Sequence, residues 1–223
     1  MKVCVIIPTY NEAKSIGNLV KRIQKMHLKV VVIDDGSKDN TGKIARENGA
    51  EVLRNETNQG KGASLIKGFD YALKNNFDAV ICMDGDGQHL PEEIPIFINL
   101  ATHSDSHILI GNRMAKRRNM PLLRVFTNKF MSWLISCITK QRIPDSQCGF
   151  RLIKRIILEK LKLTTHKYET ESEIIIKASR LGFKIDSVPI KTIYTGGKSQ
   201  INPLIDTLRF IRYIVKEIWI TPS

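Results

Sequence analysis

The fold is decided by the stretch Val80-Ile81-Cys82-Met83-Asp84-Gly85-Asp86-Gly87-Gln88, in which an apolar run ends at two carboxylates spaced by glycine. Residues 77–83 are apolar at nearly every position, which is typical of a strand buried on both faces. The glycines allow both carboxylates to turn toward one point beyond the strand. Hard oxygen ligands of this kind suit Mg²⁺ or Mn²⁺, which bind few carboxylates together with substrate phosphates. We therefore predict a metal site of Asp84 and Asp86, with Gln88 supplying a carbonyl oxygen; the alternative is a plain acid-glycine turn.

Strand-like and helix-like segments alternate on both sides of this stretch. Further strands are predicted at 3–8, 30–34, 52–53, 107–110 and 183–189. Helices are predicted at 12–26, 63–73, 91–101 and 171–181, with another that Ser37 caps and that runs through Ala45. Repeated strand-helix-strand units predict an α/β fold with a Rossmann-like, doubly wound, mostly parallel sheet.

Polar clusters follow five of the predicted strands, at 9–12, 34–37, 58–62, 84–89 and 111–113. Ligands of doubly wound sheets bind at the carboxyl ends of the strands, so the five clusters predict one cleft. The cluster at 58–62 lacks the glycine and hydroxyl positions of a Walker phosphate loop. No Gly-x-Gly-x-x-Gly follows the first strand, which disfavours an NAD enzyme.

The basic charge of the chain is large and uneven. The 223 residues carry a net charge of +13, and residues 113–163 contain thirteen Lys or Arg but only two acids, Asp145 and Glu159. Such a block predicts an anionic partner, which is a phosphorylated substrate, an acidic membrane surface or nucleic acid. A solvated face without a partner is the simplest alternative. No helix-turn-helix, zinc or aromatic-basic RNA motif supports nucleic-acid binding, so none is expected.

Two basic amphipathic stretches, 120–140 and 204–220, mix aromatic residues with Lys and Arg. This composition is typical of helices that lie at a lipid interface, although an apolar stripe that completes the core is the alternative. No apolar run reaches the roughly 18 residues of a membrane span, and the N-terminus is too strand-like for a signal peptide. Four cysteines without Cys-x-x-Cys spacing indicate reduced thiols and a cytoplasmic protein.

In chain order, the polar clusters read Pro-Thr-Tyr-Asn-Glu (8–12), Asp-Asp-Gly-Ser-x-Asp-x-Thr (34–41), Asn-x-Gly-Lys-Gly (58–62), Asp-Gly-Asp-Gly-Gln-His-x-Pro (84–91), Gly-x-Arg (111–113) and Asp-x-Gln-Cys-Gly-Phe-Arg (145–151). This series resembles the family-2 glycosyltransferases of GT-A fold, and most closely the dolichyl- or polyprenyl-phosphate mannosyl- and glucosyltransferases. The Gln-x-x-Arg-Trp motif of processive polysaccharide synthases is absent, which makes a polymerising enzyme an unfavourable interpretation.

The resemblance implies roles for the matched side chains. The nucleotide sugar would be bound by Pro8, Tyr10, Glu12, Asp35, Lys61, Asp84, Asp86, Arg113 and Arg124. The metal, Mg²⁺ or Mn²⁺, would be held by Asp84, Asp86 and Gln88. The acceptor side would be bordered by Gln147, Gly149, Arg151 and Lys198. The catalytic residues would be Asp86, Arg113 and Asp145.

The implied reaction is a single inverting displacement that moves mannose or glucose from a nucleotide sugar. A lipid phosphate acceptor, polyprenyl or dolichyl phosphate, is already anionic and needs no strong base. An acceptor hydroxyl on a sugar or protein would need one, and Asp145 is the candidate. These two acceptors, together with a non-catalytic binder of nucleotide sugar or nucleic acid, are the alternatives that the sequence leaves open.

We expect one glycosyltransferase domain over residues 1–223, with a nucleotide-sugar part at 1–115 and an acceptor and membrane-facing part at 116–223. Its partners would be the donor, a lipid phosphate and an anionic membrane surface. The expected location is cytoplasmic and peripheral on the inner face of the cell membrane. A separate membrane-spanning partner protein is a further expectation.

Overall fold

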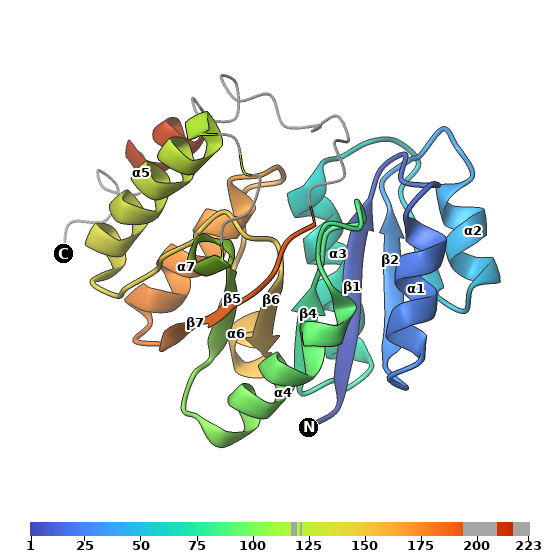
Figure 1. The fold of residues 1–223 in the computed structure, drawn as a ribbon, viewed down its shortest axis with the longest axis horizontal. Coiled ribbons are helices and arrows are strands. Elements are labelled where there is room, and N and C mark those ends of the chain that lie inside the picture. Colours follow the sequence, from blue (N-terminus) through green and yellow to red (C-terminus); the bar gives the residue numbers. More distant parts are fainter. Residues whose placement is uncertain (117–119, 121, 194–208, 216–223) are drawn as a thin grey trace.

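The computed structural model describes residues 1–116, 120, 122–193 and 209–215, and it places a seven-stranded sheet between helices (Figure 1). The strands are β1 (Val3–Thr9), β2 (Lys29–Asp34), β3 (Glu51–Arg54), β4 (Ala79–Cys82), β5 (Ile108–Asn112), β6 (Arg151–Lys154) and β7 (Ile185–Pro189). The helices are α1 (Ile16–Gln24), α2 (Thr41–Glu47), α3 (Lys61–Lys74), α4 (Ile94–His103), α5 (Leu122–Thr139), α6 (Arg155–Lys160) and α7 (Thr170–Arg180). Two 3₁₀ turns, η1 (Pro91–Glu93) and η2 (Arg113–Lys116), connect them.

The sheet is mostly parallel, as predicted, with the strand order β3-β2-β1-β4-β6-β5-β7. Strands β1 to β4 pair in parallel, whereas β6 is antiparallel to both of its neighbours, β4 and β5. Since β4 and β5 both oppose β6, they run in the same direction. The carboxyl ends of β1, β2, β3, β4 and β5 therefore lie at one edge of the sheet, where the polar clusters follow them.

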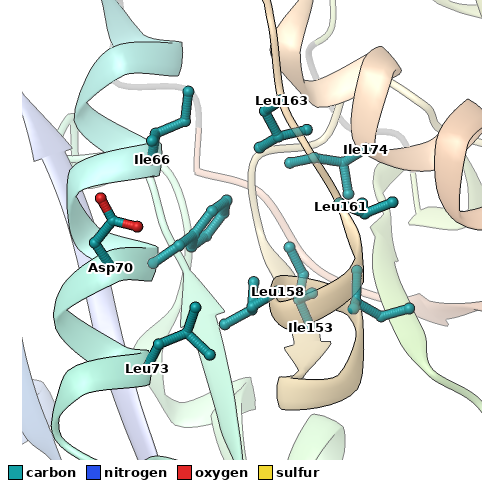
Figure 2. Close-up of a pocket in the computed structure, with 10 residues that line it drawn as sticks. Ile66, Asp70, Leu73, Ile153, Leu158, Leu161, Leu163 and Ile174 are labelled. Atoms are coloured by element: carbon teal, nitrogen blue, oxygen red, sulfur yellow. The ribbon is translucent and has the colours of Figure 1, made fainter.

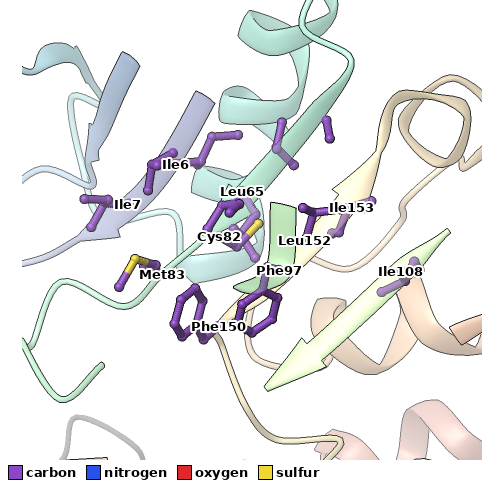
Figure 3. Packing of buried hydrophobic residues seen from close by; sticks show 14 of the residues in the cluster. Ile6, Ile7, Leu65, Cys82, Met83, Phe97, Ile108, Phe150, Leu152 and Ile153 are labelled. Atoms are coloured by element: carbon purple, nitrogen blue, oxygen red, sulfur yellow. The ribbon is translucent and has the colours of Figure 1, made fainter. Parts of the chain in front are cut away.

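The hydrophobic core lies on both faces of the central strands. Every residue of β1 is buried, and β4 is buried throughout. Figure 3 shows side chains of the central strands meeting Leu65 of α3 and Phe97 of α4, and the ring of Phe97 stacks on that of Phe150 with centroids 4.4 Å apart. Each large aliphatic side chain buried in this way contributes roughly 1.5–3 kcal/mol, so the core holds the central strands in place.

Two elements were not predicted from the sequence, and one local prediction is wrong. Strand β6 and helix α6 were not predicted, because 151–154 begins and ends on a basic residue and follows a polar loop. Ser37 does not cap α2, which begins at Thr41 after Asn40. The Ser37 hydroxyl instead accepts a hydrogen bond from the Asn11 backbone N–H at 3.0 Å, which joins two loops of the cleft.

The C-terminal stretches agree with the sequence where the structure describes them. The segment predicted at 120–140 contains α5, and 209–215 is helical, whereas 204–208 and 216–220 lie outside the described residues. In Figure 1, α5 and 209–215 both lie toward the end of the molecule away from α2. Within the described ranges, no helix combines the length and hydropathy that a bilayer crossing requires.

The four cysteines are unpaired, as expected. Burial raises the pKa of Cys4, Cys82 and Cys148 to about 12, so these thiols are protonated at neutral pH. They behave as small apolar core residues, and only Cys137 is exposed.

An apolar cavity of about 80 Å³ separates α3 from α6 and the segment that follows it (Figure 2). Ile66 and Leu73 of α3 face Leu158 and Leu161 across it, and Asp70 is its one acidic lining residue. Apart from Asp70 its lining is apolar, so it offers little chemistry to a polar substrate.

Candidate active site

The loops after β1 and β2 are fastened to each other by hydrogen bonds. The Glu12 backbone N–H donates to the Thr41 hydroxyl at 2.8 Å, and the Lys38 N–H donates to the Asn11 side-chain oxygen at 2.8 Å. Asn11 adopts a left-handed conformation with φ of +57°, which asparagine tolerates better than most residues. The predicted nucleoside-binding residues around Tyr10 and Glu12 are therefore held on a rigid edge.

Asp35, another predicted nucleoside contact, is buried and holds the loop that opens α3. Its carboxylate accepts hydrogen bonds from the backbone N–H groups of Gln59 and Gly60, at 2.9 and 2.8 Å, and from the Asn55 amide at 2.8 Å. Gly60 has φ of +103°, a conformation that only glycine adopts readily. Asp35 thereby sets the position at which Lys61 enters the site.

The Asp84 carboxylate lies at the centre of a charged cluster after β4. Lys61 Nζ lies 2.5 Å from Asp84 Oδ1 and 2.9 Å from Glu171 Oε1. The buried His89 places Nε2 3.4 Å from Asp84 Oδ2. On the remaining side, a Cβ added to Gly149 would lie 2.5 Å from Asp84 Oδ2, so only glycine fits there. Lys61 and Gly149, from two distant segments, thus meet His89 at one carboxylate.

The second carboxylate of the pair, Asp86, stands in a negative environment. Burial, followed by the charge of Asp84, raises the pKa of Asp86. Burial and the charge of Asp86 also raise the pKa of Glu12 to about 7. Burial would raise the pKa of Asp84 as well, but the Lys61 ammonium and His89 hold it well below its ordinary value. Glu12, Asp84 and Asp86 are therefore close enough for their charges to act on one another.

Carboxylate oxygens are ligands of the kind that a divalent cation prefers. Among the described residues, no three His, Cys, Asp or Glu side chains gather as a full ligand set. The site offers the Asp84–Asp86 pair, and the backbone N–H of Gln88 donates to Asp86 Oδ1 at 2.9 Å, which orients that carboxylate. A site with few protein oxygens is typical of Mg²⁺, which completes its shell with water and substrate phosphates.

Arg113 and Asp145, both predicted as catalytic, form a buried pair at the start of η2. The Arg113 guanidinium donates from Nε and Nη2 to the two Asp145 oxygens at 2.8 Å each, and the Arg113 backbone N–H donates to the same carboxylate. Such a bidentate arrangement fixes the guanidinium plane. Asp145 is 1% exposed, so its placement is that of a residue that orients Arg113.

The acceptor-side residues are divided between surface and core. Gly149 contacts Asp84, and Gln147 is partly exposed beside it. Arg151 is 1% exposed, and its guanidinium donates to the backbone carbonyls of Ser146, Cys148 and Glu171. Arg151 therefore shapes the loop 145–150 from inside instead of facing the cleft.

The remaining predicted residues lie on three other parts of the chain. Pro8 is buried in β1, Tyr10 is partly exposed after it, and Arg124 is partly exposed in the first turn of α5. Lys198 lies outside the described residues.

His89, which faces Asp84, and Glu171, which pairs with Lys61, were not assigned to the site from the sequence. Imidazole is a poor ligand for Mg²⁺, and the position of His89 beside Asp84 is that of a hydrogen-bond partner. Glu171 lies in the first turn of α7, and nothing in its local sequence indicates that it meets Lys61. Only the packing of α7 against the start of α3 brings the two together.

The comparisons with known proteins agree with this geometry. The family model described as glycosyl transferase family 2 matches residues 4–162. The UDP-N-acetylglucosamine–dolichyl-phosphate N-acetylglucosaminyltransferase of Methanococcus voltae is 33% identical over 86% of this chain and 85% of its own. The polyprenol monophosphomannose synthase of Mycolicibacterium smegmatis is 30% identical over 83% of this chain and 75% of its own.

A solved structure shares the fold. Glucosyl-3-phosphoglycerate synthase from Mycobacterium tuberculosis, in complex with Mn²⁺, uridine diphosphate and phosphoglyceric acid, superposes with a TM-score of 0.75 over 96% of this chain and 76% of its own, at 20% identity. The family match covers most of the chain, and the relatives match along most of their length. The protein is therefore a glycosyltransferase that belongs to glycosyl transferase family 2.

Proposed function

We propose that the protein transfers a hexose from a nucleotide sugar to a polyprenyl or dolichyl phosphate, with inversion and with a divalent cation. The observation that carries this proposal is the Asp84–Asp86 pair, set at the shared carboxyl edge of the sheet opposite Lys61. The relatives named for transfer to dolichyl or polyprenol phosphate support the acceptor class. They differ in the sugar, so N-acetylglucosamine stands beside mannose and glucose as a candidate.

Each residue has a task in the proposed reaction. Asp86, with Asp84 and Gln88, would hold Mg²⁺ or Mn²⁺, which when bound neutralises charge on the leaving diphosphate. Arg113, fixed by Asp145, would present a guanidinium to phosphate oxygens. Tyr10 and Glu12 would border the nucleoside. The acceptor phosphate would attack the anomeric carbon of the sugar as the bond between that carbon and the diphosphate oxygen breaks. Because the acceptor phosphate is already anionic, no proton needs to be removed.

The buried pairing of Asp145 also bears on the alternative acceptor. A general base for a hydroxyl must reach the acceptor and change its protonation state easily. Asp145 is 1% exposed and both of its oxygens accept from Arg113. This arrangement supports a phosphate acceptor over a sugar or protein hydroxyl.

The exposed surface of helix α5 is a second observation in favour of a lipid acceptor. Its outer face exposes Phe126, Phe130 and Trp133 by 71%, 49% and 61%, at the i, i+4, i+7 spacing of one helix face. On its inner face, the Ser132 hydroxyl accepts a hydrogen bond from the Ser146 backbone N–H at 2.9 Å. The helix with the aromatic outer face therefore supports the loop whose Gly149 contacts Asp84.

We propose that this aromatic face of α5 docks on an anionic bilayer. Aromatic side chains next to Lys and Arg suit the headgroup region, and the basic block at 113–163 supplies the charge. Docking would place the cleft at the surface where a lipid phosphate projects.

The reaction is tested by incubating the protein with radiolabelled GDP-mannose, UDP-glucose or UDP-N-acetylglucosamine, Mn²⁺ or Mg²⁺, and a short-chain prenyl phosphate. We expect label in an organic-extractable product with one donor, and none with Asp86→Asn. Asp70→Asn, an exposed acid of α3, is the matched control. Label that enters only water-soluble products with every donor would contradict the lipid acceptor.

A further inference from the structure

Lys61 has two carboxylate partners in the cleft, and one of them belongs to the predicted metal pair. Its Nζ lies 2.5 Å from Asp84 Oδ1 and 2.9 Å from Glu171 Oε1. The lysine and Glu171 side chains are only 17% and 10% exposed, so water screens these contacts weakly. The ammonium thus sits against an oxygen that a divalent cation would also seek.

The surroundings of Asp84 leave it little freedom to serve both cations at once. Oδ2 faces His89 Nε2 at 3.4 Å, and the Gly149 backbone closes one side of the carboxylate. Glu171, in contrast, offers Lys61 a second position that does not involve the metal pair. Lys61 is also the first residue of α3, where backbone N–H groups favour an anion such as a diphosphate.

We propose that Lys61, seated between Asp84 and Glu171, is a positioning residue that competes with the divalent cation for Asp84 and gives way to it when the donor diphosphate binds. This inference rests on the proposed function, because it assumes a metal-assisted diphosphate. Its consequence is that the cation and the nucleotide diphosphate bind cooperatively, with Glu171 holding the lysine ready for the phosphates.

The proposal predicts opposite effects of two substitutions on the affinity for Mn²⁺ alone. Lys61→Met removes the competing positive charge, so Mn²⁺ binds about tenfold more tightly. Glu171→Gln removes one of the two carboxylate partners of the Lys61 ammonium, so the ammonium stays on Asp84. Mn²⁺ therefore binds about tenfold more weakly. A purely structural role would weaken binding in both variants.

The experiment titrates Mn²⁺ into the full chain and follows the free ion by electron paramagnetic resonance, first without nucleotide and then with UDP or GDP. Lys74→Met at the other end of α3 and Glu47→Gln on α2 make the same charge changes on exposed residues and serve as matched controls. The circular dichroism spectrum of each variant reports whether it folds. The double variant Lys61→Met/Glu171→Gln lacks the lysine that Glu171 holds, so its Mn²⁺ affinity should resemble that of Lys61→Met and not that of Glu171→Gln.

Nucleotide should strengthen Mn²⁺ binding clearly less in Lys61→Met than in wild type, because the lysine no longer links the two ligands. Single variants that shift in the same direction or not at all overturn the inference, as does a double variant that resembles Glu171→Gln. These outcomes leave the proposed function intact. Wild-type protein that binds no Mn²⁺ even with nucleotide overturns the metal part of the proposed function as well, which separates the two failures.

Discussion

At the scale of single residues, the site depends on how closely Asp84 is enclosed. Lys61 holds one oxygen, His89 faces the other, and Gly149 leaves no room for a side chain. The carboxylate is thus positioned before any ligand arrives, which reduces the reorganisation that binding requires. Glycine at 149 is needed for this close approach and not for an unusual backbone angle.

Gly149→Ala should displace Asp84 and lower the transfer rate about a hundredfold, because a shift of about 1 Å in a reacting group has that effect. Steady-state kinetics of the extractable product measure it. Gly182→Ala is the control: its φ of +78° makes the substitution strained, but nothing lies within 4 Å of the added Cβ. The control should lose stability and keep its activity, and equal activity of Gly149→Ala and wild type would show that the enclosure is unimportant.

Arg151→Met should lower the stability of the fold without directly changing the affinity for the metal ion. The substitution leaves the carbonyls of Ser146, Cys148 and Glu171 without their donor, at about 1 kcal/mol or more each. Urea unfolding should show a loss of about 3 kcal/mol or more. Arg155→Met, on the more exposed arginine of α6, is the comparison, and similar losses in both variants would argue against the buried role of Arg151.

The site residues that could be predicted from the sequence are those that directly follow a recognisable strand. Asp84 and Asp86 follow an unmistakable buried strand, and Arg113 follows the next parallel one. The sequence could not show that Arg151 turns inward or that Asp145 pairs with Arg113, because both depend on how the loop 145–150 folds back. Glu171 could not be assigned to the site from the sequence either, because its partner, Lys61, lies on another helix.

At the scale of elements, helix α7 is anchored by one buried carboxylate. Glu173 accepts hydrogen bonds from the backbone and hydroxyl groups of Thr164 and Thr165, and it pairs with Lys177 at 2.5 Å. This network fixes the segment before α7 beside the start of α3, where the Ala63 N–H donates to the His166 carbonyl at 3.0 Å. The placement of Glu171 against Lys61 follows from it.

Glu173→Gln should lower stability at neutral pH by about 2 kcal/mol. Burial would raise the pKa of Glu173, but Lys177 and the threonine hydrogen bonds lower it below its ordinary 4.5. A folded-state pKa below the unfolded one stabilises the protein above about pH 4.5, and this contribution is lost as the pH falls further. The difference between wild type and variant in urea unfolding should therefore narrow from pH 7 to pH 3.5. A difference that stays constant or widens, while exposed Glu159→Gln has no effect, would contradict this role.

Helices and strands were predictable where their apolar residues recur at a regular helical or strand spacing. Fully buried strands such as β1 and amphipathic helices such as α1 have strong local patterns. The four-residue β6 has none, and its antiparallel pairing between β4 and β5 is imposed by the sheet. Its omission left the direction of the strands at the cleft unaffected, so the prediction of a shared carboxyl edge was still correct.

At the scale of the whole molecule, α5 carries an exposed aromatic face on the same helix as Arg124 and Lys129. If this face docks on an anionic bilayer, binding to phosphatidylglycerol vesicles should be strong at low salt and fall steeply by 1 M salt, where the screening length shrinks from about 10 Å to about 3 Å. Vesicle sedimentation measures it. A variant with Phe126→Ser and Trp133→Ser should bind less, whereas Ile96→Ser, at an equally exposed site on α4, should not. Binding that ignores both salt and the α5 substitutions would refute the docking face.

In the proposed reaction, Asp84 and Asp86 hold a divalent cation on the donor diphosphate. Electron paramagnetic resonance of bound Mn²⁺ with ¹⁷O-labelled UDP or GDP tests it most directly, because ¹⁷O broadens the Mn²⁺ signal only when a phosphate oxygen coordinates the ion. We expect broadening with wild-type protein and loss of the bound signal in Asp86→Asn. A bound signal without broadening, or wild-type Mn²⁺ affinity in Asp86→Asn, would contradict the claim.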